Sequence, residues 1–311
     1  MSAADTTDLF VHPALFYRDS DEYLSGTIGF IREGLAKGEP VAVAVPTENL
    51  ALLRAVLGSD GESVRLMDMT VEGRNPGRII PGVLRAFADA HPAGRVRIIG
   101  EPIWAGRSAT EYPACVQHEA LINAAFAGCE VTILCPYNAA SLSAEVLADA
   151  RATHPTLFDS AGESVSSAYN PEHIVASYNR PLEDPPGTAM LLAFDGAALA
   201  GVRHLAVDYA RNAGMTPERI IDMELVIAET TTNSVVHGGG RGTLALWPAD
   251  GQLCCQVRDS GHISNPLAGR LPAPARVPGG RGLLIVNQLA DLVCMYTGVQ
   301  GTTLYIRLPL V

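Results

Sequence analysis

The sequence lacks three features that would each assign it to a particular class of protein. Its 311 residues hold 22 Lys and Arg against 33 Asp and Glu, a formal charge of −11, so it offers no basic footprint for nucleic acid or an anionic membrane. It has no apolar run of about 18 residues, the length that a membrane-spanning helix needs. Its first ten residues, MSAADTTDLF, lack the basic and apolar segments of a signal peptide. We therefore expect a soluble, cytoplasmic protein that contacts neither nucleic acid nor membranes directly.

Paired cysteines and phosphate-binding loops are also missing. The six cysteines form no CxxC pair and no metal-ligand spacing, so we expect free and mostly buried thiols. The motif GxxxxGKS/T is absent, which excludes a P-loop nucleotide site. The 48% of hydrophobic residues is typical of a folded protein, and the length favours two domains. The cysteines are Cys115, Cys129, Cys135, Cys254, Cys255 and Cys294.

The first half of the chain alternates between short apolar runs and amphipathic stretches. Such alternation predicts an α/β domain with a parallel sheet and helices on both of its faces. Thr47 is expected to be the N-cap of one of these helices. The expected strands are residues 41–45, 64–68, 96–100 and 131–135, and the expected helices are 20–37, 47–57, 77–90, 110–127 and 141–151.

A polar stretch separates this half from a second domain. Residues 159–187 gather Ser, Pro and acidic side chains and predict a linker with one short helix near 171–178. We therefore place the domains at residues 1–158 and 188–311. In the second domain strands and helices are grouped, which predicts an α/β sandwich with a mixed, mostly antiparallel sheet. The expected elements are strands at 189–195, 243–247, 252–258, 292–297 and 302–308, with a turn at Asp250-Gly251, and helices at 196–213, 217–237 and 281–290.

The longest of these helices carries three polar residues at intervals of four. Thr216 and Pro217 supply an N-cap and a proline at the first helical position. At about 100° per residue, Glu229, Asn233 and His237 form one stripe opposite the apolar side of the helix. Taken alone, this stripe favours a solvated face with i,i+4 hydrogen bonds over a binding site.

Three later motifs favour the binding site. RDSG (258–261) places an aspartate at the end of a strand, and GGRGL (279–283) opens a helix whose N–H groups can face an anion. Gly-Thr-Thr (301–303) enters the last strand. In this order, the set resembles the GHKL, or Bergerat, nucleotide-binding fold of gyrase, Hsp90 chaperones, histidine kinases and MutL. Over about residues 187–311 it is most similar to anti-sigma factor serine kinases of the RsbW and SpoIIAB type.

This resemblance implies that the second domain binds ATP and Mg²⁺. It implies that Asn233 coordinates Mg²⁺ and that Glu229 takes the proton from an attacking serine hydroxyl. His237 is interpreted as a structural residue or a phosphate neighbour. The other implied nucleotide contacts are Asp259, Gly261 and Thr302 at the adenine and Gly280, Arg281 and Gly282 at the phosphates.

The implied function is that of an anti-sigma factor with serine/threonine-protein kinase activity. It would bind a sigma factor and keep it inactive, phosphorylate an anti-anti-sigma (STAS) protein, and be able to form a homodimer. One alternative is a non-catalytic sequestering module, because Ile263 stands where a second glycine is usual and the stretch 262–280 is rich in proline. Another is a histidine-kinase-like sensor, although the linker does not resemble its phospho-accepting helix pair. Arg270, Arg276 and Arg281 are expected to offset triphosphate charge.

The sequence of the first domain predicts a separate site for a small molecule. In open parallel sheets ligands bind beyond the carboxyl ends of the strands, where several polar and aromatic residues gather here. Neighbouring His118, Glu119 and Asn123 fit no metal spacing, and His154 is expected to cap a helix end. The candidate ligand residues are His12, Tyr17, Asp68, Glu101, Trp104, Cys135 and Tyr137.

The same domain resembles a sensory module. HPALFYRDSDEYL near the start, with NPGRIIP, GEPIW and LCPYN further on, is similar to the MEDS domain across about residues 10–158. The resemblance implies a RecA-like sheet without the catalytic loop. It also implies that the domain senses small, hydrocarbon-derived molecules.

Overall fold

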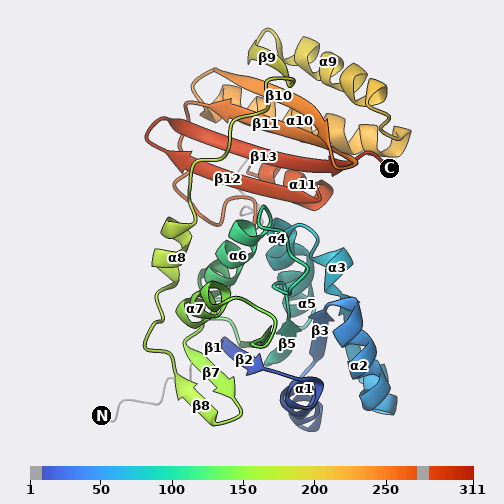
Figure 1. Cartoon of the computed structure of the whole chain (residues 1–311), viewed down its shortest axis with the longest axis vertical. Helices are drawn as coiled ribbons and strands as arrows, with labels where there is room; N and C mark the ends of the chain where they lie inside the picture. The colour runs from blue at the N-terminus through green and yellow to red at the C-terminus, as the bar shows by residue number, and fades with distance from the viewer. Residues whose placement is uncertain (1–8, 272–279) are drawn as a thin grey trace. The chain divides into compact units, whose positions relative to one another are not determined.

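The computed structural model describes residues 9–271 and 280–311, which form two compact units (Figure 1). The first contains the described residues up to Arg74 together with Gly82–Tyr178, and the second contains Asn75–Pro81 and Asn179–Val311. The boundaries that composition suggests at residues 158 and 188 stay a prediction. Within the described residues, no helix is both long and apolar enough to cross a membrane.

The sheet of the first unit is parallel except at one edge. Its order is β4-β3-β5-β6-β2-β7-β8, with β1 also paired to β6, and only the β7–β8 pair is antiparallel. The four expected strands are confirmed, and β6 continues three residues beyond its predicted end. The strands are β1 (Phe10–Val11), β2 (Pro13–Tyr17), β3 (Val41–Val45), β4 (Val64–Asp68), β5 (Val96–Gly100), β6 (Val131–Asn138), β7 (Thr156–Asp159) and β8 (Gly162–Val165).

Helices pack on this sheet because the inner strands are apolar on both faces. Val41, Val43 and Val45 share a buried cluster with residues of α1 and α2, while the alternate Ala42 and Ala44 are also fully buried. The helical elements are α1 (Ser20–Ala36), α2 (Thr47–Leu57), η1 (Gly58–Ser63), α3 (Met69–Glu72), η2 (Ile80–Arg85), α5 (Ala86–Asp89), α6 (Tyr112–Ala125), α7 (Ala144–Thr153) and α8 (Pro171–Ser177), and α4 (Pro76–Ile79) groups with the second unit.

Three details of this unit differ from expectation. The strand β2 was missed because it is short and opens with a proline, a residue that weakens a strand assignment. The hairpin of β7 and β8 lies in the predicted linker, and β8 is exposed throughout, so no apolar pattern marks it. Thr47 is not an N-cap: Pro46 occupies that position, and the Thr47 hydroxyl donates instead to Asp68 at 2.6 Å.

Among its described residues, the second unit has one sheet and, besides the short α4, three longer helices, which lie together against one face of that sheet (Figure 1). Every described strand pair is antiparallel, in the order β12-β13-β11-β10-β9, rather than mixed as expected. Asp250 and Gly251 have φ of 50° and 74°, the backbone of the predicted tight hairpin. The elements are β9 (Met190–Asp195), α9 (Leu199–Asn212), α10 (Pro217–His237), β10 (Arg241–Ala249), β11 (Gln252–Asp259), α11 (Gly282–Leu289), β12 (Leu292–Gly298) and β13 (Gly301–Pro309).

The core of the second unit fixes the orientation of α10. Met223, Val226 and Ile227 are fully buried in one cluster with strand residues such as Leu244 and Ile306. At helical spacing this buried face leaves Glu229 and Asn233 partly exposed. The expected fold class, a parallel α/β unit followed by an α/β sandwich, is therefore confirmed.

Candidate functional site

The stripe on α10 lies directly against the start of α11. A Cβ atom added to Gly282 would lie 2.5 Å from Glu229 Oε2 and 3.0 Å from Asn233 Nδ2. A side chain at this position would displace the ends of the Glu229 and Asn233 side chains, so glycine permits the observed approach of the two segments. The structure thus brings Glu229, Asn233 and Gly282 together, although they are separated by about fifty residues of sequence.

The segment before α11 is built to present backbone N–H groups. Gly280 has φ of +76°, in the left-handed region that favours glycine, and Arg281 is the N-cap without a side-chain cap hydrogen bond. The first N–H groups of a helix have no partner within it and carry partial positive charge. With a carboxylate and an amide oxygen alongside, the arrangement suits a phosphate group bound together with a hard cation.

Asp259 is held in a fixed orientation at the end of β11. Its Oδ2 accepts a 2.6 Å hydrogen bond from Ser234 of α10, and its Oδ1 accepts one of 2.8 Å from the Gly261 N–H. A Cβ atom on Gly261 would lie 2.7 Å from the carbonyl oxygen of His237, so the backbone approaches the end of α10 closely. Ser234, which sequence reasoning missed, is therefore the residue that ties Asp259 to the helix of Glu229 and Asn233.

Thr302, on the last strand, lies next to Asp259 and Gly261. It pairs with Asp259 across β11 and β13, and its hydroxyl donates to the Gly261 carbonyl at 2.9 Å. The Ile263 N–H donates to the Thr297 hydroxyl at 3.0 Å, which anchors the chain where a second glycine was expected. Asp259, Gly261 and Thr302, predicted as adenine contacts, thus form one hydrogen-bonded group.

The arginines expected near the phosphates have different environments. Arg270 is only 8% exposed and its Nη1 donates to the Pro76 carbonyl at 3.4 Å, so it is part of the packed interior of the second unit. Arg281 stands at the start of α11, and Arg276 lies outside the described residues. His237 is exposed at the last position of α10.

In the first unit, two of the predicted ligand residues form a buried polar group at the carboxyl ends of the strands. The Tyr17 hydroxyl donates to Glu101 at 3.0 Å, and the Asn49 amide donates to both carboxylate oxygens at 2.8 and 3.0 Å. Burial raises the pKa of Glu101 to about 8, against the opposing effect of the Asn49 and Tyr17 hydrogen bonds. The same burial, with Glu101 nearby, raises the pKa of Tyr17 above its ordinary range.

Two other predicted ligand residues have structural partners. Asp68 caps α3 by accepting from the Thr70 N–H at 2.9 Å, and hydrogen bonds from Thr47 and Thr70 lower its pKa against the effect of burial. Trp104 is half-buried under the guanidinium of Arg107, which lies 4.0 Å from the ring centre. These contacts account for both residues without a ligand.

The remaining three, His12, Cys135 and Tyr137, are buried within the unit. Tyr137 and Cys135 belong to β6 itself, because that strand runs on to Asn138. His12 and Cys135 lie beside Glu119 and His154, which were not predicted as site residues. His154 ends α7 as expected. None of the six cysteines, all of which lie in the described residues, forms a disulfide, and Cys129 alone among them is partly exposed.

Comparison with known proteins identifies both halves of the chain. Residues 11–155 match the MEDS family, described as the MEthanogen/methylotroph, DcmR Sensory domain, and residues 192–308 match the histidine kinase-like ATPase domain. The crystal structure of the RsbU and RsbW domains of Rv1364c from Mycobacterium tuberculosis is similar at 22% identity, with a TM-score of 0.31, over 40% of this chain. The chain spans 33% of that structure's length. No curated protein matches the sequence.

Proposed function

We propose that this chain, which joins a MEDS domain to a histidine kinase-like ATPase domain, is a regulatory kinase that binds Mg-ATP and phosphorylates a serine of a partner protein. One observation carries the proposal: Glu229 and Asn233 lie against Gly282, at the exposed N-terminus of α11. A carboxylate, a metal-ligating amide and a phosphate-binding helix start are the groups that phosphoryl transfer requires.

The described residues fit a nucleotide and its metal. Asp259 has both carboxylate oxygens oriented by hydrogen bonds, as an acceptor for an adenine amino group must be. Thr302 and Gly261 stand next to it. Asn233 would supply a hard oxygen ligand to Mg²⁺, and the metal would neutralise phosphate charge when bound.

Glu229 is the proposed catalytic residue. Being four residues before Asn233, it lies one helical turn away on the same stripe. It would take the proton of the serine hydroxyl while that oxygen bonds to the γ-phosphorus and the bond to the bridging oxygen breaks, releasing ADP. The α11 N–H groups would hold the transferred phosphate in line.

The partner is proposed from the resemblance to anti-sigma factor serine kinases. The chain would bind a sigma factor and a STAS protein in alternation, and phosphoserine would add nearly two negative charges to the STAS surface. These charges would expel the STAS protein and leave the kinase free to hold the sigma factor. A small molecule bound by the MEDS domain would bias that exchange.

A second candidate function is non-catalytic sequestration by a domain with a degenerate nucleotide site, and Ile263 favours it. A bulky residue replaces the usual glycine, and its N–H is engaged by Thr297. Under this alternative the second domain would hold its partner without transferring phosphate. It predicts that a Glu229 variant sequesters the sigma factor as well as the wild-type chain, with no phosphoserine formed by either.

Calorimetry on the full chain is the first test. Wild type should bind ATP only with Mg²⁺, Asn233→Ala should lose this binding, and Glu229→Gln should keep it. Glu224→Gln, a change of an exposed glutamate on the same helix, is the matched control and should behave as wild type. Absence of ATP binding by wild type would reject the proposal.

Transfer is tested next by mass spectrometry of a STAS protein encoded in the same genome. Wild type and Glu224→Gln should form phosphoserine, and Glu229→Gln should form none while still binding ATP. Equal phosphorylation by Glu229→Gln would remove that residue from the catalytic role. A base-stable, acid-labile phosphohistidine on the chain itself would instead indicate a histidine kinase.

A further inference from the structure

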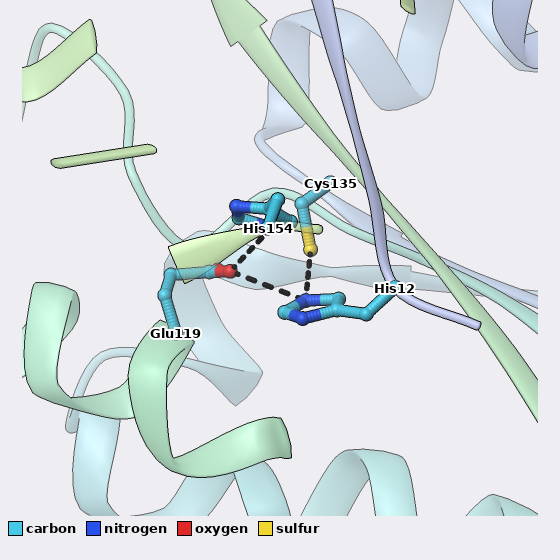
Figure 2. A group of neighbouring side chains, drawn as sticks. All are labelled: His12, Glu119, Cys135 and His154. Atoms are coloured by element: carbon cyan, nitrogen blue, oxygen red, sulfur yellow. Dashed lines mark hydrogen bonds and ion pairs between the residues drawn. The ribbon is translucent and has the colours of Figure 1, made fainter. Parts of the chain in front are cut away.

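Four side chains with metal-binding atoms converge inside the first unit (Figure 2). They come from separate segments: His12 precedes β2, Glu119 lies on α6, Cys135 on β6, and His154 follows α7. One ligand atom from each lies within 4.8 Å of those of the other three. None of the four residues is more than 1% exposed.

The hydrogen bonds around the cluster fix the tautomer of each histidine in its neutral form, with the proton on the outer nitrogen, Nδ1. His154 Nδ1 lies 2.8 Å from the Ala150 carbonyl oxygen, so it is this nitrogen that donates. His12 Nδ1 lies 3.2 Å from Asn123 Oδ1, and the Asn123 amide nitrogen donates to the Thr153 carbonyl at 2.9 Å, which fixes the amide orientation. Neutral His12 and His154 therefore each direct an Nε2 lone pair toward the centre of the cluster.

The His154 lone pair faces the Glu119 carboxylate, and the His12 lone pair faces both this carboxylate and the Cys135 thiol, with which it forms a hydrogen bond. His154 Nε2 lies 3.1 Å and His12 Nε2 lies 3.6 Å from Glu119 Oε2, and Cys135 Sγ lies 3.4 Å from His12 Nε2. Among the described residues, neither oxygen of Glu119 nor His154 Nε2 has a hydrogen bond of acceptable geometry. A buried carboxylate without compensation costs several kcal/mol, so a cation between these atoms would remove a large penalty.

Three of the six separations between the four ligand atoms are close to those of a tetrahedral ion, and the other three are within 4.8 Å. With Zn–N and Zn–O bonds of about 2.0–2.1 Å and a Zn–S bond of about 2.3 Å, a tetrahedron has nitrogen–oxygen edges of about 3.3 Å and sulfur–nitrogen edges of about 3.6 Å. The observed edges of 3.1, 3.6 and 3.4 Å fall around these values. Two imidazoles, a thiolate and a carboxylate also match the ligand preferences of zinc.

We propose that His12, Glu119, Cys135 and His154 bind one Zn²⁺ ion in a closed, structural site. Four protein ligands fill a tetrahedral coordination sphere, and complete burial leaves no position for a substrate. The ion would link the start of β2, α6, β6 and the end of α7, so its binding would stabilise this unit. The hydrogen bonds from Nδ1 to Ala150 and Asn123 are the outer contacts that orient zinc-bound imidazoles.

The first experiment is a Co²⁺ titration of the full chain after chelator treatment, followed by displacement with Zn²⁺. Wild type should bind one equivalent, with the intense visible bands of tetrahedral Co²⁺ and a thiolate charge-transfer band, and Zn²⁺ should abolish both. Cys135→Ser should lose the charge-transfer band. Cys129→Ser, which alters a thiol of the same unit outside the cluster, should leave the spectrum unchanged.

An outer-contact variant tests the imidazole orientation. Asn123→Ala should retain one metal equivalent but bind it about 10- to 100-fold more weakly. Circular dichroism of each variant shows whether it is folded, and the wild-type stoichiometry tests the site even where a variant does not fold. The proposal fails if wild type binds no stoichiometric Co²⁺ or Zn²⁺, or if Cys135→Ser gives the same spectrum as wild type. The competing explanation is an ion pair of Glu119 with charged histidines and no metal, and it predicts that neither protein binds the metal at this site.

Discussion

Replacing Glu101 with glutamine should change the pH dependence of stability in a defined direction. Glu101 is 2% exposed and accepts hydrogen bonds from Tyr17 and Asn49. Burial raises its pKa from an ordinary value of 4.5 to about 8, so the folded protein holds it as a neutral acid at neutral pH. Glutamine has nearly the same shape and remains neutral at every pH. Its carbonyl oxygen can accept from Tyr17 and Asn49 in place of Oε1, but its NH₂ group cannot accept in place of Oε2.

The direction in which the free energy of unfolding changes with pH follows from proton binding by Glu101 in the folded and unfolded states. Below pH 4.5 the folded and unfolded chains both hold the proton, and the contribution of Glu101 is fully present. Between 4.5 and about 8 only the unfolded chain releases it, so the free energy of unfolding falls as the pH rises. At about 1.4 kcal/mol per pH unit, the fall across this window amounts to at most about 5 kcal/mol. Glu101→Gln should lack this fall.

The assay uses the only tryptophan of the first unit. In a Trp247→Phe background, Trp104 is the sole remaining indole, and its fluorescence during urea unfolding reports on that unit. The free energy of unfolding is compared between about pH 5 and about pH 8, with Glu48→Gln as an exposed glutamate control. The reasoning is refuted if Glu101→Gln shows the same fall as the wild-type residue, or if the wild-type stability does not fall.

Three further substitutions test the second unit. Ser234→Ala removes the 2.6 Å hydrogen bond to Asp259. Since a hydrogen bond to a charged group contributes about 1.5–3 kcal/mol, the ATP affinity measured by calorimetry should fall about 10-fold or more. An unchanged affinity would contradict the role of this hydrogen bond. Gly282→Ala should weaken Mg-ATP binding at least as much, because its Cβ would displace the Glu229 carboxylate and the Asn233 amide. Gly201→Ala, with no atom near its added Cβ, is the control that should bind as wild type. Ile306→Ala, at a fully buried position, should lower the free energy of unfolding by about 2–5 kcal/mol, measured by Trp247 fluorescence; a change below about 1 kcal/mol would contradict its place in the core.

The parts of the fold that the sequence predicted are those with a strong local pattern. Residues 41–45 and 217–237 were placed to the residue, because a fully apolar run and a long amphipathic repeat each leave few alternatives. The edge strand β8 was missed because its four residues are all exposed, so its pairing with β7 produces no hydrophobic alternation. Strand β2 is as short and as fully buried as residues 41–45, but it was missed because it opens with a proline, which weakens a strand assignment.

The nucleotide site and the proposed metal site also differ in how far local sequence motifs predict them. Glu229, Asn233 and the residues around Asp259 could be proposed from sequence because each lies in a short motif with a characteristic order of strand, loop and helix. The structure adds their proximity and the Ser234 hydrogen bond, while their roles in binding and transfer stay predictions. Arg270 shows the limit of charge-based reasoning, because an arginine in a loop can equally be buried through backbone hydrogen bonds.

The proposed metal site could not be predicted from short motifs, and the positions of its four residues in the fold explain why. His12 and Cys135 meet because β2 and β6 are neighbours in the sheet, with Ala14 opposite Cys135, although more than a hundred residues separate them. Glu119 and His154 are brought to that place by the packing of α6 and α7, so no two of the four ligands share a motif. Spacing rules detect ligands that lie close in the chain, as in zinc fingers, but a site assembled by parallel strands and their crossover helices has no fixed spacing. If the ion is bound as proposed, removing it should therefore loosen contacts between segments distant in sequence. Hydrogen exchange after chelation should increase around the start of β2 and the end of α7 together, and an increase confined to one of them would contradict a shared ion.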